Sequence, residues 1–177
     1  MSPQKFEGQV EQLGRGVQLC FDHGLTIPGL IILYAGIDAM GWLIRLTDAV
    51  EVRRNFEGFV VDYMLHSYDG SAGSAAQVAT DLYGARCALL HTQTAESNLT
   101  HQGQAREVHY RSGNGTGLVP VTTTNTPTLP LIVDPRGLLK DFQHGVDRLK
   151  RAMAQDQTLA TRVYERAAFY FDAGQWL

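Results

Sequence analysis

The sequence predicts a mainly helical bundle that carries a small β-hairpin insertion. Three observations favour this fold class. Apolar residues recur at helical spacing along most of the chain, one long segment is apolar all round like a central bundle helix, and β-type patterns are confined to residues near 105–134. The length of 177 residues suits one domain. We therefore expect residues 1–177 to form a single helical-bundle domain with the β insertion near 105–134.

Two helices are expected in the N-terminal part of the chain. Residues 5–22 have a weak helical pattern that Gly14 and Gly16 interrupt, and residues 26–46 form the most apolar stretch of the sequence. Asp38 lies within this stretch, and the apolar run before it is too short to cross a bilayer. A carboxylate at the middle of a membrane span is also costly. We therefore expect a buried core helix and no membrane span.

An amphipathic helix is expected next, over residues 51–67, with Asp48 and Glu51 placed as a capping box. A flexible loop over residues 69–76 should separate it from another helix. That helix has an apolar stripe at Val78, Leu82, Ala85 and Leu89.

The β insertion follows. Residues 106–112 alternate and residues 118–124 are β-branched, with a glycine-rich turn between them, so they predict a hairpin. Residues 129–133 could add a strand. Apolar stripes over residues 138–153 and 159–170 then predict a closing pair of helices.

Composition excludes several classes of function. The formal net charge of −3 argues against binding nucleic acid by bulk positive charge. Cys20 and Cys87 lack the spacing of a disulfide framework, and the histidines lack metal-ligand spacing. The glycine-rich run at 113–117 fits a hairpin turn, because no Gly-Lys-Ser/Thr follows it. With no secretory leader at the N-terminus, we expect a cytoplasmic protein without metal or cofactor.

One pair of residues points to chemistry. Arg86-Cys-Ala-Leu-Leu-His91 places an arginine and a histidine near a helix end with four residues between them. This arrangement resembles the R-x4-6-H motif of the HEPN superfamily (higher eukaryote and prokaryote nucleotide-binding domains), helical bundles in which the motif serves metal-independent RNases. The preceding apolar helix with its acid, Asp38, is also similar. The commoner motif has a polar residue where this chain has Cys87, and the resemblance covers residues 27–95.

The resemblance implies that Arg86 and His91 cleave or hold RNA, and that two copies meet across a homodimer to form one cleft. Histidine can move the proton of a ribose 2′-OH or of the 5′ leaving oxygen. Arginine stays charged and holds phosphate oxygens. Attack by the 2′-OH would leave a 2′,3′-cyclic phosphate, which restricts cleavage to RNA. Such RNases occur in toxin or phage-defence systems, so an antitoxin or regulatory partner is expected.

Two other functions remain open from the sequence. One is a non-catalytic HEPN-like module that binds RNA, a nucleotide or a protein partner. The other is an unrelated helical interaction protein. Cleavage of RNA would separate the first function from the second, and two-fold pairing of the motif helices would separate both from the third.

Helix geometry sets a condition on the motif. Five positions at 100° each place His91 about 140° around an ideal helix from Arg86, so the two side chains do not share a face. The polar run that follows, with Thr92 and Thr94, continues a helix poorly. We therefore expect the helix to fray or end near His91, which would let its ring turn toward Arg86.

Asp38 is the third candidate catalytic residue. A buried carboxylate needs a partner, and Arg86 or His91 would bring it into the site. The alternative is a structural pairing with Arg45, with Arg53 or with a backbone amide.

Three further residues are candidates for substrate binding. Glu96 and Ser97 follow the motif and could line the same cleft, or belong to a solvated loop. Arg106 begins a basic and aromatic segment that could stack a base, or form a sheet edge. The basic residues of the last two helices could similarly track an RNA backbone or form an ordinary solvated face.

Overall fold

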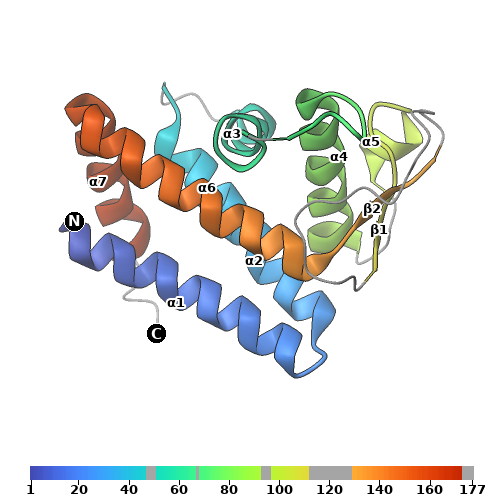
Figure 1. Ribbon diagram of the computed structural model, residues 1–177, viewed down its shortest axis with the longest axis horizontal. Coiled ribbons are helices and arrows are strands. Elements are labelled where there is room, and N and C mark those ends of the chain that lie inside the picture. Colours follow the sequence, from blue (N-terminus) through green and yellow to red (C-terminus); the bar gives the residue numbers. More distant parts are fainter. Residues whose placement is uncertain (47–50, 67, 93–96, 112–128, 173–177) are drawn as a thin grey trace.

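The computed structural model describes residues 1–46, 51–66, 68–92, 97–111 and 129–172, and confirms the mainly helical fold (Figure 1). Its helices are α1 (Pro3–Asp22), α2 (Thr26–Ile44), α3 (Val52–Phe59), α4 (Ala75–Cys87), α5 (Asn98–His101), α6 (Pro135–Gln155) and α7 (Gln157–Asp172). Two π-helical turns, η1 (Val60–Met64) and η2 (Ala88–Thr92), extend α3 and α4. The strands are β1 (Val108–Tyr110) and β2 (Leu131–Val133).

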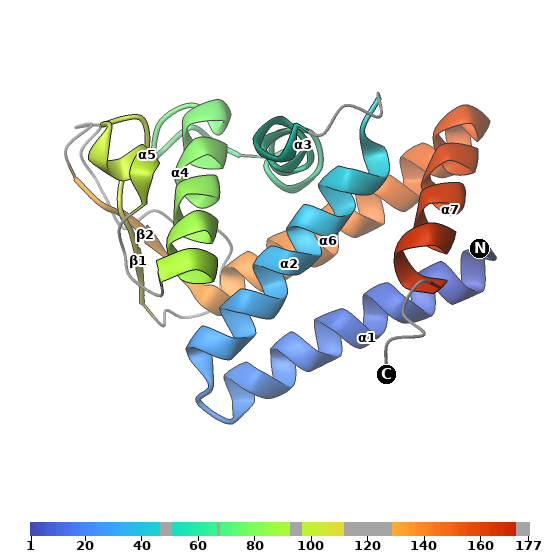
Figure 2. The same ribbon diagram turned by 180° about the vertical axis from the view of Figure 1, so that it is seen from behind.

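Helix α2 is the centre of the bundle. It packs against α1, α3, α6 and α7, while α4 and the strands lie at one end of the molecule and α7 at the other (Figures 1 and 2). The inner face of α2 is fully buried, and its buried large side chains are Leu30, Leu33, Tyr34, Ile37, Met40 and Leu43. Among the described helices, α2 is long and apolar enough to cross a membrane, yet over half of that window is buried inside the fold (56%). These contacts fit the predicted core helix.

Glycine at one position lets α2 approach α3 closely. A side chain at Gly41 would meet the backbone of Asn55, because an added Cβ would lie 2.5 Å from the Asn55 carbonyl oxygen. The close approach brings the two backbones together, and Phe56 and Phe59 of α3 are fully buried beside it. The α2–α3 crossing therefore depends on a residue without a side chain.

The small sheet pairs β1 with the additional strand expected at residues 129–133. β1 pairs with β2 in parallel, with Val108 opposite Leu131 and Tyr110 opposite Val133. Residues 118–124, the expected hairpin partner, lie outside the described residues, so the hairpin stays a prediction. β2 leads into α6, and Leu131 and Val133 are buried. The Tyr110 hydroxyl also bonds the buried Tyr34 hydroxyl of α2 at 2.7 Å, which fixes β1 to the core.

Two helices differ from the sequence-based expectation, α1 in its continuity and α3 in its start. α1 is continuous through Gly14 and Gly16, because its apolar face packs on α2 and α6 and this packing outweighs the low helix propensity of glycine. α3 begins at Val52, later than a capping box at Asp48 requires, and its N-cap residue Glu51 makes no side-chain cap bond. Asp48 itself lies outside the described residues.

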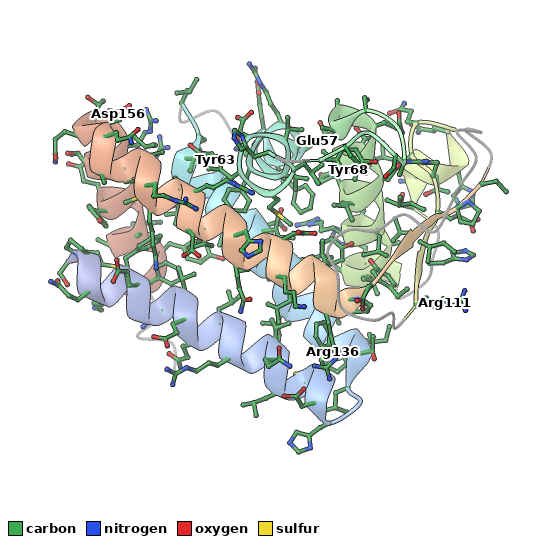
Figure 3. The ribbon with its side chains drawn as sticks, in the orientation of Figure 1. Glu57, Tyr63, Tyr68, Arg111, Arg136 and Asp156 are labelled. Carbon is green, nitrogen blue, oxygen red and sulfur yellow. The ribbon has the colours of Figure 1, made fainter. Side chains whose placement is uncertain are left out.

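Arginine side chains cap the C-terminal ends of several helices. Arg136 donates to the carbonyl oxygen of Phe21 at the end of α1, at 3.1 Å, and lies at the start of α6 beside that end (Figure 3). Arg148 donates to the carbonyls that end η1, and Arg166 to those that end α2. A cation at a helix C-terminus satisfies unpaired carbonyls and complements the helix dipole. Arg148 and Arg166, expected on an RNA-tracking or a solvated face, thus serve the fold.

Candidate functional site

The candidate site begins with an ion pair between α2 and α4. Arg86 Nε donates to Asp38 Oδ2 at 2.6 Å, and the side chains keep only 16% and 21% of their surface exposed. The expected contact between Asp38 and Arg86 is therefore present. Asp38 Oδ1 is buried and has no partner among the described residues. The pair thus includes an acceptor atom that no described protein group satisfies.

His91 joins this pair through the π-helical turn η2. Arg86 Nη1 lies 3.4 Å from His91 Nε2. A π-turn closes i→i+5 hydrogen bonds, so each residue advances less around the axis than in an α-helix. His91 therefore returns toward the face of Arg86 while the chain stays helical through Thr92. The helical segment is described as far as Thr92, one residue after His91, so the prediction that the helix frays or ends near His91 stays a prediction. The wider turn brings the His91 ring toward Arg86 in either case.

A hydrogen bond in this contact would have one direction. An arginine N–H can only donate, so His91 Nε2 would accept through its lone pair, in the tautomer that carries its proton on Nδ1. In that form Nε2 carries a lone pair, and the His91 side chain is exposed to solvent. The histidine can therefore take a proton from a bound group, provided that the group displaces the long contact to Arg86.

Burial sets the electrostatics of the ion pair. Desolvation raises the pKa of Asp38, and the hydrogen bond and charge of Arg86 only partly oppose this rise. The pKa of Arg86 is also raised, because its bond to the Asp38 carboxylate and that charge outweigh the cost of burial. Arg86 therefore keeps its charge, and the attraction of Asp38 fixes the orientation of its guanidinium plane.

Tyr83 and Cys87 complete the surroundings of Arg86. The Tyr83 ring centroid lies 5.8 Å from Arg86 Cζ, and Tyr83 packs edge-on against Phe56 at 5.5 Å. The Cys87 thiol also contributes to the raised pKa of Arg86. We did not propose Tyr83 from the sequence. It could have been found from its position, because a residue three places before Arg86 on a helix lies on the same face.

A stripe of α2 faces outward around Asp38. Ile27, Ile31, Ala35, Asp38 and Trp42 recur at spacings of three and four, and each is at least partly exposed. At one end of this stripe, Ile27 presents an aliphatic side chain at the start of α2. At the other end, the Trp42 ring contacts Phe169 and Tyr170 of α7. The acid of the candidate site therefore lies between an aliphatic and an aromatic patch.

The remaining sequence-predicted residues lie elsewhere. Ser97 is buried as the N-cap of α5, where its Oγ accepts from Thr100 N at 3.3 Å. Glu96 lies outside the described residues. Arg106 extends its guanidinium to the fully buried Asp81 of α4, with Nε at 2.8 Å from Asp81 Oδ2, and to the Ala72 carbonyl at 2.7 Å. Arg106 thus holds α4 to the segment that follows it, while Ser97 caps α5.

The described residues offer no cluster for a metal ion. Within residues 1–46, 51–66, 68–92, 97–111 and 129–172, no group of three or more His, Cys, Asp and Glu side chains lies close enough to hold one.

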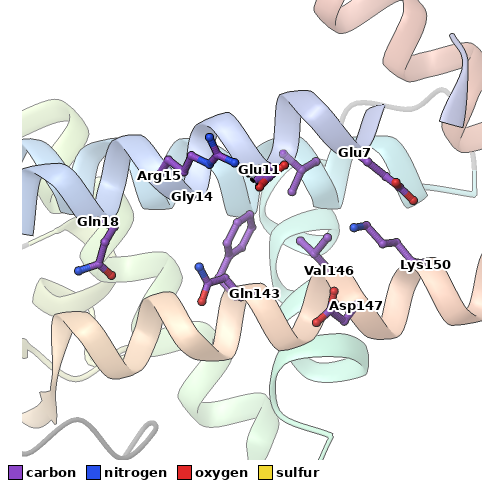
Figure 4. Close-up of a pocket in the computed structure, with 11 residues that line it drawn as sticks. Glu7, Glu11, Gly14, Arg15, Gln18, Gln143, Val146, Asp147 and Lys150 are labelled. Carbon is purple, nitrogen blue, oxygen red and sulfur yellow. Dashed lines mark hydrogen bonds and ion pairs between the residues drawn. The ribbon is translucent and has the colours of Figure 1, made fainter. Parts of the chain in front are cut away.

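A groove elsewhere on the molecule has mixed chemistry. It lies between α1 and α6 with a volume of about 430 Å³ (Figure 4). Its lining combines an apolar floor with acids and bases, namely Val10, Phe142, Val146, Glu7, Glu11, Asp147, Arg15 and Lys150. Asp38, Arg86 and His91 do not line it. The groove is therefore separate from the candidate site.

Comparison with known proteins gives no match, since no protein-family model, no curated protein and no solved structure matches this chain. The resemblance to HEPN proteins therefore stays a hypothesis that rests on Arg86, His91 and Asp38 and on the helical fold.

Proposed function

We propose that this protein is a HEPN-like, metal-independent endoribonuclease. One observation carries the proposal: Arg86 contacts both Asp38, at 2.6 Å, and His91, at 3.4 Å, at a partly exposed position on the bundle. A fixed guanidinium beside an exposed imidazole combines a phosphate-binding cation with a proton-transfer group. We place this activity in the cytoplasm, in a toxin or phage-defence role controlled by an antitoxin or regulatory partner.

The mechanism assigns one task to each residue. Arg86 binds the oxygens of the phosphate to be cut and stabilises the charge that develops on them. Neutral His91 Nε2 accepts the proton of the ribose 2′-OH, whose oxygen then attacks the adjacent phosphorus. The bond from phosphorus to the 5′-oxygen breaks, that oxygen takes a proton from a protonated histidine or from water, and a 2′,3′-cyclic phosphate remains. Asp38 is a positioning residue, because its carboxylate orients Arg86 without contacting the RNA.

We further propose that two copies share one cleft. Proton removal and proton donation occur at opposite sides of the phosphate, and each chain supplies one histidine in the cluster. The aliphatic half of the outward α2 stripe, formed by Ile27, Ile31 and Ala35, offers the second copy a surface that continues directly into Asp38. Burying apolar surface of this kind drives association.

Ile27→Glu is therefore expected to turn a dimer into a monomer and to lower RNA cleavage with it. The substitution places a charge in the proposed interface, yet a glutamate suits the first turn of a helix, so α2 should remain intact. Light scattering at tens of micromolar protein measures the change. Val52→Glu is the matched control, because Val52 is similarly exposed in the first turn of α3 (43% against 47% for Ile27). A monomeric wild-type protein would contradict the shared cleft.

A second function has one observation in its favour. Asp38 offsets part of the charge of Arg86, which lowers the charge available to stabilise a transition state and suits a module that binds RNA, a nucleotide or a protein without cutting it. Such a module would bind RNA through Arg86 and leave it whole.

Incubation of the purified protein with RNA in EDTA separates the two functions. The ribonuclease is expected to cut single-stranded RNA with the metal removed and to leave DNA of the same sequence intact, because DNA lacks the 2′-OH. The binding module would retain the RNA in a gel-shift experiment without cutting it. Intact RNA both with and without divalent metal would end the ribonuclease proposal.

A further inference from the structure

The aromatic half of the outward α2 stripe is built from rings of α2 and α7. Trp42 lies one helical turn after Asp38, and its ring stacks against Phe169 at 6.3 Å and contacts Tyr170 at 5.7 Å. Phe169 is 73% exposed and Tyr170 46% exposed. We call Trp42, Phe169 and Tyr170 the aromatic cluster. Its rings pack on one another while much of their surface faces solvent.

Charged side chains lie next to the aromatic cluster. Arg45 Cζ lies 4.4 Å from the centre of the Trp42 ring, and Arg45 follows the end of α2, three residues after Trp42 and seven after Asp38. Burial, and after it the charge of Asp38, raises the pKa of the Tyr170 hydroxyl. One helical turn rises about 5.4 Å, so the cluster begins within the span of a nucleotide from Asp38.

We propose that the aromatic cluster is a stacking subsite for an unpaired base of a single-stranded RNA whose adjacent phosphate is held by Arg86. This inference rests on the proposed function for the position of the phosphate. Every base has a π-face that can stack on an exposed ring, so such a subsite binds single strands with little sequence preference. Arg45 beside Trp42 adds positive charge where the RNA backbone would continue.

The same features favour a base over a second copy of this chain. A protein interface at this position would have to remove water from the charged Arg45 side chain and from the Tyr170 hydroxyl, and removing water from polar groups costs free energy. A nucleotide instead offers a flat ring to Phe169 and a negative phosphate to the nearby arginines. The aliphatic half of the stripe is free of these groups and suits the second copy better.

Tryptophan fluorescence can report binding at the cluster directly. The chain contains Trp42 and Trp176, so Trp176→Phe leaves Trp42 as the sole tryptophan. In this background His91→Ala prevents cleavage during the titration. A short oligouridylate is expected to quench Trp42 emission, whereas the same oligonucleotide with abasic sites should quench it little and bind about 5- to 100-fold more weakly. Equal binding of both oligonucleotides would overturn the inference.

Phe169→Leu tests the ring itself. Leucine keeps the apolar bulk on an exposed position and removes the π-face, so we expect oligouridylate binding to weaken about 5-fold or more with the melting midpoint unchanged. In the protein that keeps His91, Phe169→Leu should raise KM and leave kcat close to the wild-type value, because a binding contact remote from the cleaved bond is lost. Leu129→Ala is the control, because Leu129 is also an exposed apolar residue and lies two residues before β2.

The possible outcomes separate the inference from the proposed function. Cleavage that Phe169→Leu leaves unchanged would overturn the stacking subsite while the ribonuclease stands. Base-dependent quenching by a wild-type protein that never cuts RNA would support the subsite and end the ribonuclease. A Phe169→Leu protein that loses self-association instead of RNA binding would assign the cluster to a protein interface and overturn the inference.

Discussion

His91→Ala is expected to lower the rate of RNA cleavage by about 10²- to 10⁴-fold, the usual contribution of a positioned general acid or base. The fold should survive, because the His91 ring is exposed and its described contact is the 3.4 Å approach to Arg86. Initial rates on a labelled single-stranded RNA, with the melting midpoint measured in parallel, test both statements. His144→Ala on α6 is the matched control, since His144 is also exposed.

Arg86→Ala should remove a similar part of the activity, about 10²- to 10³-fold, through loss of charge stabilisation in the transition state. It also leaves the partly buried Asp38 without its cation, so some stability is lost as well. Arg86→Ala combined with Asp38→Asn removes that unpaired charge and separates the two effects. Recovery of stability without recovery of cleavage is the expected result. A variant of either Arg86 or His91 that cuts RNA normally would remove the cluster from the mechanism.

Asp81→Ala is expected to have the largest effect on stability, about 3–5 kcal/mol off the free energy of unfolding. Asp81 is completely buried (0% exposed) and accepts from the Arg106 backbone N–H at 2.7 Å and from Arg106 Nε at 2.8 Å. Gln77 adds a third bond at 3.0 Å. Without the carboxylate, the Arg106 charge stays buried with only the Ala72 carbonyl as a partner among these contacts.

Urea unfolding of Asp81→Ala and Asp38→Ala measures the difference between the two acids. Asp38→Ala should cost less, because Asp38 and Arg86 keep part of their surface in water (21% and 16%). Asp81→Ala should therefore shift the unfolding midpoint further. An equal or smaller shift than that of Asp38→Ala would show that the buried network of α4 contributes little.

Local patterns predicted the helices well, for a physical reason. The stripe Val78, Leu82, Ala85 and Leu89 repeats at the period of a helix, and all four side chains are buried on one face. We did not predict the continuity of α1 through its glycines or the late start of α3. Packing between helices decides where a helix continues and where it begins, and it leaves no local pattern in the sequence. The parallel pairing of β1 and β2 was missed for the same reason, since strands far apart in sequence leave no local pattern of their partner.

The candidate site was predictable in part. The sequence indicated that Asp38 has a partner, because a carboxylate within an apolar helix requires one, and Arg86 was one of several candidates. The π-turn that returns His91 toward Arg86 could not, since it depends on how α4 packs. Asp81 carried a signal that we overlooked: it lies three places after Val78 and four before Ala85, within the apolar stripe. Its partner Arg106 lies outside α4, so no helical spacing linked Arg106 to Asp81 in the sequence.

The chemistry of the product ends tests the central claim most directly. A single-stranded RNA with one ribose replaced by 2′-deoxyribose at the main cleavage position is incubated with the protein in EDTA, and the product ends are identified by mass. The account predicts that the unmodified RNA yields 2′,3′-cyclic phosphate ends and that the deoxy substitution blocks cutting at that position. Cleavage that persists at the deoxy position, or that leaves 5′-phosphate ends, would contradict attack by the 2′-OH and with it the roles of Arg86 and His91.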